Sequence, residues 1–354
     1  MAKGVEDTAF YRWFRLASLN EVGGDPDHFG VPPEEFHAYS ARMLRDWPVT
    51  MTTLTTHDTK RNEDVRARLA VLSEMPAEWG EAVRSWRALA EDHREPALDG
   101  MTEYLIWQTL VGTWGANGPI SGERLLGYLE KAIREAKLHT TWTSPDEEYE
   151  TAVHDFAVGV LGDEAVLAAV AAFGERIAPA VRAGTLGQKL VQLCMPGVPD
   201  VYQGTEAVEL SLVDPDNRRP VDYGDRRARL ARLDSGARPV DLADEKVLVT
   251  SRALRLRREH PEWFTGEDAT YAPAATTTGN AVAFARGDAA GPGAVVVTTR
   301  LAVALERLGG WGDHAVSLPE GRWRDLLTGT EVDGGSVRLA DLLSALPVAL
   351  LVRA

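Results

Sequence analysis

The chain has 354 residues, of which 44% are hydrophobic and 26% charged, and a formal net charge of −15. This composition is typical of a soluble globular protein, and the length allows two or three domains. The acidity argues against an extended phosphate-binding surface, so we expect no nucleic-acid partner. No apolar run approaches the roughly 20 residues of a membrane span, so no membrane partner is expected either.

The first residues, MAKGVEDTAFYRWF, lack the apolar core of a secretory signal. The single cysteine, Cys194, excludes an internal disulfide, and its apolar context favours a packing role over a nucleophilic one. Together these features favour a reducing, cytoplasmic location. Aromatic and charged residues are dense at the N-terminus, although chain ends are usually poorly ordered. We therefore expect Met1 to lie within a larger folded region.

A short strand is predicted over residues 50–56, which are β-branched or apolar and carry no charge. Ser121 is expected to cap the fourth of the helices that follow, and Ser144, Pro145 and Glu147 to begin the fifth. Apolar residues at helical spacing predict helices at 60–75, 77–93, 101–114, 121–139, 144–161 and 163–182.

After this helical block, the segment MPGVPDVYQGTE predicts a short strand at Val201 and Tyr202 that ends in a polar loop. A further helix is expected over residues 246–260. Beyond it, short apolar stretches alternate with Gly and Asp turns, at residues 280–288, 293–301, 321–329 and 333–343. This pattern indicates a small antiparallel β domain.

His57 and Asp58 stand where the predicted strand gives way to a charged helix. In α/β barrels this edge carries functional side chains; a carboxylate there can face a ligand, and a neighbouring histidine can donate to one. The alternative is that Asp58 caps the next helix. The spacing alone favours capping, because aspartate before a helix is common.

A second polar cluster comprises Asp200, Tyr202, Gln203 and Glu206, at the end of the other predicted strand. These side chains could bind hydroxyl groups. A turn with solvated acids explains the same residues equally well, and their pattern leaves both interpretations open.

The segment SLVDPDNRRPVDY contains Asp214, Asp216 and Asn217 but lacks the spacing and glycine of an EF-hand, so no metal site is predicted. Arg218 and Arg219 are expected to pair with nearby acids. Most of the ten tryptophans stand at helical spacing and are expected in the core, although some could stack on sugar faces. Phosphate-loop, dinucleotide-binding, zinc-protease and nucleophile-elbow motifs are absent from the sequence.

Four segments, taken together and in order, resemble the maltooligosyltrehalose synthase family of the α-amylase superfamily. They are MAKGVEDTAFYRWFRLASLNEVGGDP, TLTTHDTKRNEDVRARLAVLSEMP, HTTWTSPDEEYE and MPGVPDVYQGTEAVELSLVDPDNRRPVDY. The resemblance runs from Met1 to Tyr223, and the β region after Lys246 suits the family's C-terminal domain. It covers the C-terminal portion of the family's chain.

The resemblance implies an α/β fold: the C-terminal part of a (β/α)₈ barrel with a large helical insertion, followed by a small antiparallel β domain. Residues 1–59 would form the partial barrel through strand seven, and residues 60–190 the helical insertion. Residues 191–243 would supply strand eight and the following loop. Residues 244–354 would form the linking helix and the C-terminal β domain.

The family converts the reducing-end α-1,4 link of a maltooligosaccharide, an α-1,4-glucan, into an α,α-1,1 (trehalose) link. This retaining chemistry needs a nucleophilic carboxylate and an acid/base carboxylate about 5 Å apart. Water must be excluded, because it would hydrolyse the intermediate. The resemblance implies that no redox cofactor or metal is required.

By the same resemblance, Asp58 matches the family's third carboxylate, at the end of strand seven, which binds ring hydroxyls and favours the oxocarbenium-like transition state. His57 matches the histidine that contacts the same sugar. Lys60 and Arg61 match the THDTKR extension and would shape the reducing-end pocket. Asn62 departs from the family pattern, in which serine is expected.

Further substrate-binding residues are implied at strand eight and near the N-terminus. The strand-eight group, near the pocket rim, is Tyr202, Gln203 and Glu206. The N-terminal group, lining the cleft, is Tyr11 with the acids Glu6 and Asp7.

The nucleophile and the acid/base have no counterpart in this chain, because no Arg-x-Asp-His-like stretch precedes Asp58. Glu6 and Glu21 stand in a different context and are not substitutes. One hypothesis is a synthase that acts only with a separate chain carrying the N-terminal half barrel. A second is an inactive or glucan-binding remnant, and sequence does not decide between the two. A third, a helical module unrelated to sugar, is disfavoured by the motifs.

Overall fold

The computed structural model describes residues 2–354, with side chains from Gly4 onward. The contacts divide the chain into two compact units, each assembled from separate stretches of sequence. Unit 1 comprises the chain up to Phe29 together with His57–Ala178 and Glu209–Arg219. Unit 2 comprises Gly30–Thr56, Pro179–Val208 and Pro220–Ala354. Each unit is described by itself.

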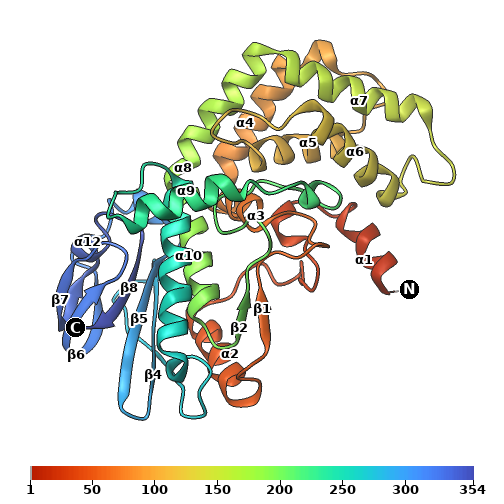
Figure 1. Ribbon diagram of the computed structural model, residues 1–354. Helices are drawn as coiled ribbons and strands as arrows, with labels where there is room; N and C mark the ends of the chain where they lie inside the picture. The colour runs from red at the N-terminus through yellow and green to blue at the C-terminus, as the bar shows by residue number, and fades with distance from the viewer. Residues whose placement is uncertain (1) are drawn as a thin grey trace. The chain divides into compact units, whose positions relative to one another are not determined.

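Unit 1 is helical (Figure 1). Its α-helices are α1 (Ala2–Phe10), α3 (Glu63–Ala70), α4 (Pro76–Leu89), α5 (Gly100–Gly112), α6 (Gly122–Ala136), α7 (Glu147–Gly162) and the first half of α8 (Glu164–Cys194). Short 3₁₀ turns lie at Ala17–Leu19, Val71–Glu74, Glu91–His93 and Asp216–Arg218. The predicted helical block is thereby confirmed.

An aromatic cluster forms part of the core of unit 1. Trp86 lies between Trp79 and Trp107, with ring centroids 5.5 and 5.6 Å away, and Trp107 meets Phe156 edge-on at 5.7 Å. Tilted and edge-on arrangements of this kind are favourable for aromatic rings. The expectation that the tryptophans at helical spacing are core residues is confirmed for these three.

The predicted start of α7 is wrong. The helix begins at Glu147, and Asp146 is its N-cap, with its side chain accepting the N–H of Tyr149 at 3.0 Å. Aspartate is as effective an N-cap as serine, and here it directly precedes the first helical residue. Ser121 does occupy the N-cap of α6, although its side chain makes no capping hydrogen bond.

Helix α8 is longer than predicted and runs on to Cys194 through Pro179. Proline lacks the N–H for an internal helix bond, which makes it a poor residue for a helix interior. The boundary between the two units falls at this residue, between Ala178 and Pro179.

Unit 2 contains a six-stranded antiparallel sheet in the order β3-β4-β5-β8-β6-β7. Its strands are β3 (Thr270–Pro273), β4 (Ala281–Asp288), β5 (Gly291–Thr299), β6 (Ala315–Asp325), β7 (Glu331–Arg338) and β8 (Val348–Arg353). The predicted C-terminal β region is confirmed. β3 and β8, which the sequence pattern did not reveal, complete the sheet.

The central strands are apolar on both faces because both faces are covered. Phe284, Val296 and Leu350 share a core with the end of α8 and with α10 (Leu242–Glu259). Their strand neighbours, such as Val295 and Leu351, face a second core that includes α12 (Leu339–Leu342). Side chains that alternate along a strand therefore serve two cores.

Unit 2 also contains a parallel pair of short strands, β1 (Met51–Thr53) and β2 (Val198–Asp200) (Figure 1). β1 lies within the strand predicted over residues 50–56 but is shorter. β2 begins three residues before the strand expected at Val201 and Tyr202. Gly197 allows the close approach: its φ is +112°, and a Cβ there would lie 2.8 Å from the carbonyl oxygen of Thr50.

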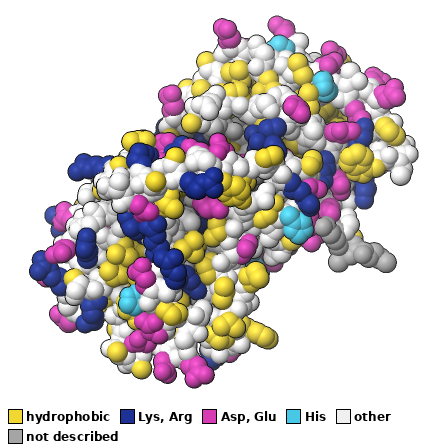
Figure 2. Space-filling view, viewed as in Figure 1, with side chains coloured by type: hydrophobic (Ala, Val, Ile, Leu, Met, Phe, Trp, Pro, Cys, Tyr) yellow, Lys and Arg dark blue, Asp and Glu magenta, His cyan; other side chains and the backbone are white. Residues whose placement is uncertain are grey.

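The remaining helices of unit 2 are α2 (Pro33–Asp46), α9 (Tyr223–Asp234) and α11 (Ala302–Arg307). The sequence pattern did not identify α2 or α9. No single described helix is long and apolar enough to cross a membrane; only α7 and α8 taken together pass that test, with a bend of 76° between them. Acidic and basic side chains are interspersed on the face shown in Figure 2.

Candidate functional site

The centre of the candidate site in unit 1 is the loop that carries Asp58 and Lys60. The Lys60 ammonium is buried, with 3% of the side chain exposed, and its Nζ lies 2.5 Å from Oδ1 of Asp7 and 4.0 Å from Oδ1 of Asp58. The Asp58 side chain keeps 27% of its surface exposed, and His57 is exposed. The structure thus brings three of the expected residues, Asp7, Asp58 and Lys60, into one charged cluster.

Asp58 does not cap the helix that follows it, so the capping alternative is wrong. Helix α3 begins at Glu63, and its N-cap is Asn62, whose side chain accepts the N–H of Asp64 at 3.2 Å. The Asn62 N–H in turn donates to the carbonyl of Ser211 at 3.0 Å. The residue that departs from the family pattern therefore performs the capping, and the Asp58 carboxylate is not required for it.

The backbone of the loop is held by Glu21, a buried carboxylate for which the sequence pattern predicted no role. Its Oε1 accepts the N–H of Lys60 at 2.8 Å, and its Oε2 accepts the N–H of Arg61 at 3.2 Å. A carboxylate that receives two backbone donors fixes their orientation strongly. No local signal could have revealed this contact, because Glu21 is distant in the sequence.

Arg61 and Tyr11 lie beneath the surface of unit 1. Arg61 is 1% exposed and donates to the Tyr128 hydroxyl at 2.7 Å and to the carbonyl of Ala17 at 3.4 Å. Tyr11 is 2% exposed, and burial together with the charge of Tyr128 raises its pKa well above the usual value. Among the described residues, no partner hydrogen-bonds the Tyr11 hydroxyl. Both side chains are buried beneath the candidate site, and direct contact of either one with a ligand stays a prediction.

The residues that the resemblance places at strand eight belong to unit 2. Tyr202 is half-buried and Gln203 is exposed. The Glu206 carboxylate lies 3.6 Å from Nε of Arg226, and its carbonyl accepts the Thr250 hydroxyl at 3.3 Å. Glu206 also lines a cavity of about 330 Å³ between α9 and α10. At such a cavity the carboxylate can accept hydrogen bonds from hydroxyl groups, and the neighbouring guanidinium can donate them.

The acidic segment that contains Asp214 and Asp216 is part of an ion-pair network in unit 1. Arg124 donates to both oxygens of Asp216 at 2.7 and 2.8 Å, Arg219 also contacts Asp216, and Arg218 pairs with Asp214. Burial alone would raise the pKa of Asp216, but hydrogen bonds, chiefly from Arg124, hold it below its ordinary value. The predicted pairing of Arg218 and Arg219 with acids is confirmed. Within residues 2–354, no group of three or more potential ligands is placed to hold a metal.

Cys194 is fully buried at the end of α8, and burial raises the pKa of its thiol to about 12. A thiol with so high a pKa carries little thiolate and is a poor nucleophile. The predicted packing role is confirmed.

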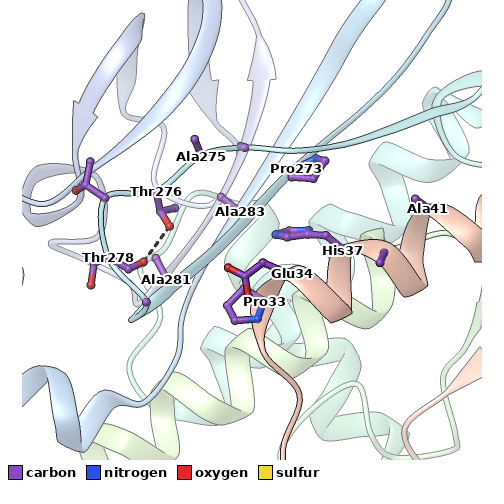
Figure 3. Close-up of a pocket in the computed structure, with 14 residues that line it drawn as sticks. Pro33, Glu34, His37, Ala41, Pro273, Ala275, Thr276, Thr278, Ala281 and Ala283 are labelled. Carbon is purple, nitrogen blue, oxygen red and sulfur yellow. Dashed lines mark hydrogen bonds between the residues drawn. The ribbon is translucent and has the colours of Figure 1, made fainter.

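A larger cavity of about 820 Å³ in unit 2 is lined by none of the expected site residues. Figure 3 shows Glu34 and His37 of α2 projecting toward Pro273, Ala281 and Ala283 of the sheet. The rest of the lining consists largely of alanine and threonine side chains. The His37 Nδ1 lies 2.7 Å from the Tyr271 hydroxyl.

No family model matches the chain. Two proteins of Mycobacterium tuberculosis strains, provisionally named maltooligosyl trehalose synthases, are 44% identical to it over 358 residues. The match covers 99% of this chain and 44% of theirs.

Among solved structures, maltooligosyltrehalose synthase from Arthrobacter ramosus is 44% identical, with a TM-score of 0.92 over 100% of this chain and 45% of that chain. DSM5389 glycosyltrehalose synthase is 33% identical, with a TM-score of 0.82, over 100% of this chain and 44% of that chain. These matches define a class of trehalose-forming enzyme. Over its whole length the chain is homologous to maltooligosyltrehalose synthases, and it spans about half the length of the curated relatives it matches.

Proposed function

We propose that the chain contributes to a maltooligosyltrehalose synthase reaction, in which the reducing-end α-1,4 link of a maltooligosaccharide becomes an α,α-1,1 link. The reaction is an intramolecular glucosyl transfer, that of a (1→4)-α-D-glucan 1-α-D-glucosylmutase. The family relationship supports this proposal. The observation that carries it is the position of Asp58, a partly exposed carboxylate 4.0 Å from a buried ammonium and not used as a helix cap.

In this proposal Asp58 is the transition-state stabiliser. Its carboxylate accepts hydroxyl hydrogens of the reacting glucose, and hydrogen bonds of this type strengthen as the ring approaches an oxocarbenium-like geometry. Lys60, held by Asp7, orients the carboxylate by Coulomb attraction. His57 contacts the same sugar from the exposed side of the loop.

We further infer that β1 and β2 correspond to strands seven and eight of a (β/α)₈ barrel. Their parallel pairing, with Thr53 opposite Asp200, supports this correspondence. Parallel strands end at the same edge, so the segments that continue to Asp58 and to Tyr202 leave from one edge, where barrel enzymes place their sites. On this basis we propose that residues 1–59 form the partial barrel and residues 60–190 the helical insertion. Residues 191–243 form the end of the barrel, and residues 244–354 form the linking helix and the β domain.

The proposal assigns the nucleophile and acid/base to polypeptide with the family's N-terminal sequence, outside these 354 residues. Cleavage of the α-1,4 bond would form a glycosyl-enzyme on the nucleophile and release glucose. The anomeric hydroxyl of that glucose would then attack the same carbon and displace the carboxylate, with the acid/base removing the proton. Tyr202, Gln203 and Glu206 would bind the glucan near the rim of the pocket, while Lys60, Arg61 and Tyr11 shape it.

Complementation tests this assignment. The chain is co-expressed with the part of the Arthrobacter ramosus enzyme that lies outside the matched region, and maltopentaose conversion to non-reducing product is assayed. We expect no turnover by the chain alone and measurable turnover by the pair. The Arthrobacter ramosus enzyme split at the same point serves as the positive control.

Asp58→Asn should lower kcat of the complemented pair by about 100-fold or more, because a transition-state contact is lost. The matched control is Asp155→Asn, an exposed carboxylate of α7. Equal activity of the Asp58→Asn and Asp155→Asn pairs would refute the role of Asp58. A pair that assembles and binds maltopentaose but does not turn it over, while the split control does, would favour the glucan-binding remnant.

A further inference from the structure

Trp142 stands out among the tryptophans of unit 1. It belongs to the segment HTTWTSPDEEYE, which joins α6 to the first turn of α7 (Figure 1). The proposed function assigns no role to this segment. Whereas Trp79, Trp86 and Trp107 are core residues, Trp142 is 52% exposed. An exposed indole offers a large flat apolar surface to a ligand.

The exposed ring is nevertheless held in place. The guanidinium carbon of Arg134 lies 4.9 Å from the centre of the Trp142 ring, within the range of a cation–π contact. Arg134 is itself fixed by Glu150, at 2.9 and 2.7 Å, and by Glu130, at 2.6 Å. One face of the Trp142 ring therefore packs against a guanidinium that two carboxylates hold in place.

Hydrogen bonds also constrain the backbone of the loop that carries Trp142. The N–H of Thr141 donates to the carbonyl of Ser144 at 3.2 Å, and the N–H of Ser144 donates to the Thr141 hydroxyl at 2.9 Å. The Thr140 hydroxyl bonds to Glu150, the same carboxylate that fixes Arg134. Little conformational freedom remains to be lost when a ligand binds the indole, which favours binding.

A groove of about 280 Å³ between α6 and α7 lies next to this support. Glu130 and Glu150 line the groove and also bind Arg134, so the groove and the Trp142 ring share the same ion pairs. Leu129, Ile133 and Val153 supply an apolar floor, and His154 a polar edge. The surface thus combines an aromatic plane, apolar C–H contacts and hydrogen-bonding groups.

We propose that Trp142 and the α6–α7 groove form a binding surface for an α-1,4-glucan. The indole stacks against the C–H face of one glucose ring, and Glu130 and His154 bind hydroxyls of its neighbour. The local charge, two carboxylates and one guanidinium, suits a neutral polyhydroxyl ligand better than an anionic one. This inference rests on the proposed function and adds a site for the part of the glucan that does not react.

Fluorine NMR of the full chain labelled with 5-fluorotryptophan tests the proposal directly. The Trp142 resonance is assigned by its absence in Trp142→Phe. Maltoheptaose should shift this resonance saturably, and the β-linked cellohexaose should not. Trp142→Ala should weaken maltoheptaose binding at least about fivefold, the loss of one stacking contact.

Trp47→Ala is the matched control, because Trp47 is 67% exposed at the end of α2 in unit 2. It should leave maltoheptaose binding unchanged. Asp58→Asn should leave the Trp142 shift unchanged as well, so the two sites can fail separately. An unshifted Trp142 resonance at saturating maltoheptaose, or equal shifts with cellohexaose, would overturn the proposal even if complementation restores activity.

Discussion

The Lys60 ammonium lies 2.5 Å from the carboxylate of Asp7, and only 3% of the lysine side chain is exposed. This ion pair joins α1 to the loop that carries Asp58, within unit 1. A buried charge is tolerable when a partner of opposite charge compensates it. The pair therefore bears on both the stability of unit 1 and the orientation of Asp58.

Replacing Asp7 by Asn should lower the free energy of unfolding on the order of 3 kcal/mol, because the lysine charge stays buried without its nearest partner. The double variant Asp7→Asn/Lys60→Met should be more stable than the single variant, since the uncompensated charge is gone. Urea denaturation measures both. A single variant as stable as the parent chain would show that the pair contributes nothing.

Glu21→Gln should destabilise the loop at Lys60 and Arg61. An amide has one acceptor oxygen, so one of the two backbone N–H groups now accepted by Glu21 would face an NH₂ donor, at a cost of about 1–3 kcal/mol. Hydrogen exchange at Lys60 and Arg61 should become faster. Glu35→Gln, at an exposed position of α2, is the control and should leave exchange at both amides unaltered.

The stability of unit 2 should fall on acidification through His37. Burial lowers the pKa of His37 below its ordinary value of 6.5, against a smaller opposing effect of Glu34. The unfolded chain therefore takes up a proton at higher pH than the folded chain does. The stabilisation is complete above about pH 6.5, declines as the pH falls toward the lowered pKa, and then levels off.

His37→Gln removes the titrating group and should flatten the dependence of the urea midpoint on pH between about pH 7.5 and about pH 5. His154→Gln, at an exposed position of α7, should leave the parent profile intact. Identical profiles for the parent chain and His37→Gln would contradict this assignment.

Arg286 should be irreplaceable by lysine. Its buried guanidinium donates to the carbonyls of Trp263 and Phe264, each at 3.0 Å, and to that of Cys194 at 3.4 Å. It thereby joins the sheet to the end of α8 and to the segment after α10. A lysine ammonium is a point charge without the planar fork of donors, so it cannot reproduce all three bonds.

We expect Arg286→Lys to lose at least about 2 kcal/mol in urea denaturation, because buried carbonyls lose their donors. Arg300→Lys is the control, at a position that is half-buried and donates to the carbonyl of Gly279. A loss at Arg286 no greater than at Arg300 would rule out this role for the guanidinium.

Much of the secondary structure could be predicted because it depends on local periodicity. The helices from α3 to α7 follow apolar residues at helical spacing, with α5 buried nearly all round. Short apolar stretches between Gly and Asp turns likewise indicated β4 and β5, whose central residues are buried on both faces. Boundaries were less accurate: Asp146 replaces Ser144 as a cap, and β2 precedes Val201.

The candidate site was predictable only in part. Long motifs pointed to Asp58 and to the family, because residues consecutive in sequence carry that signal. Glu21 and the support of Trp142 by Arg134 and Glu150 were not predictable. Each depends on contacts between separate elements of secondary structure, and pairing of this kind has no local periodicity.

The sequence by itself determined the helical and β regions, the absence of an internal disulfide and the family resemblance, since composition, periodicity and motif order are properties of neighbouring residues. Only the tertiary structure decided that Asn62 caps α3 in place of Asp58, that Lys60 is buried between two carboxylates, and that Trp142 is braced yet exposed. Burial and charge pairing depend on which segments fold against one another. That arrangement is a property of the whole chain.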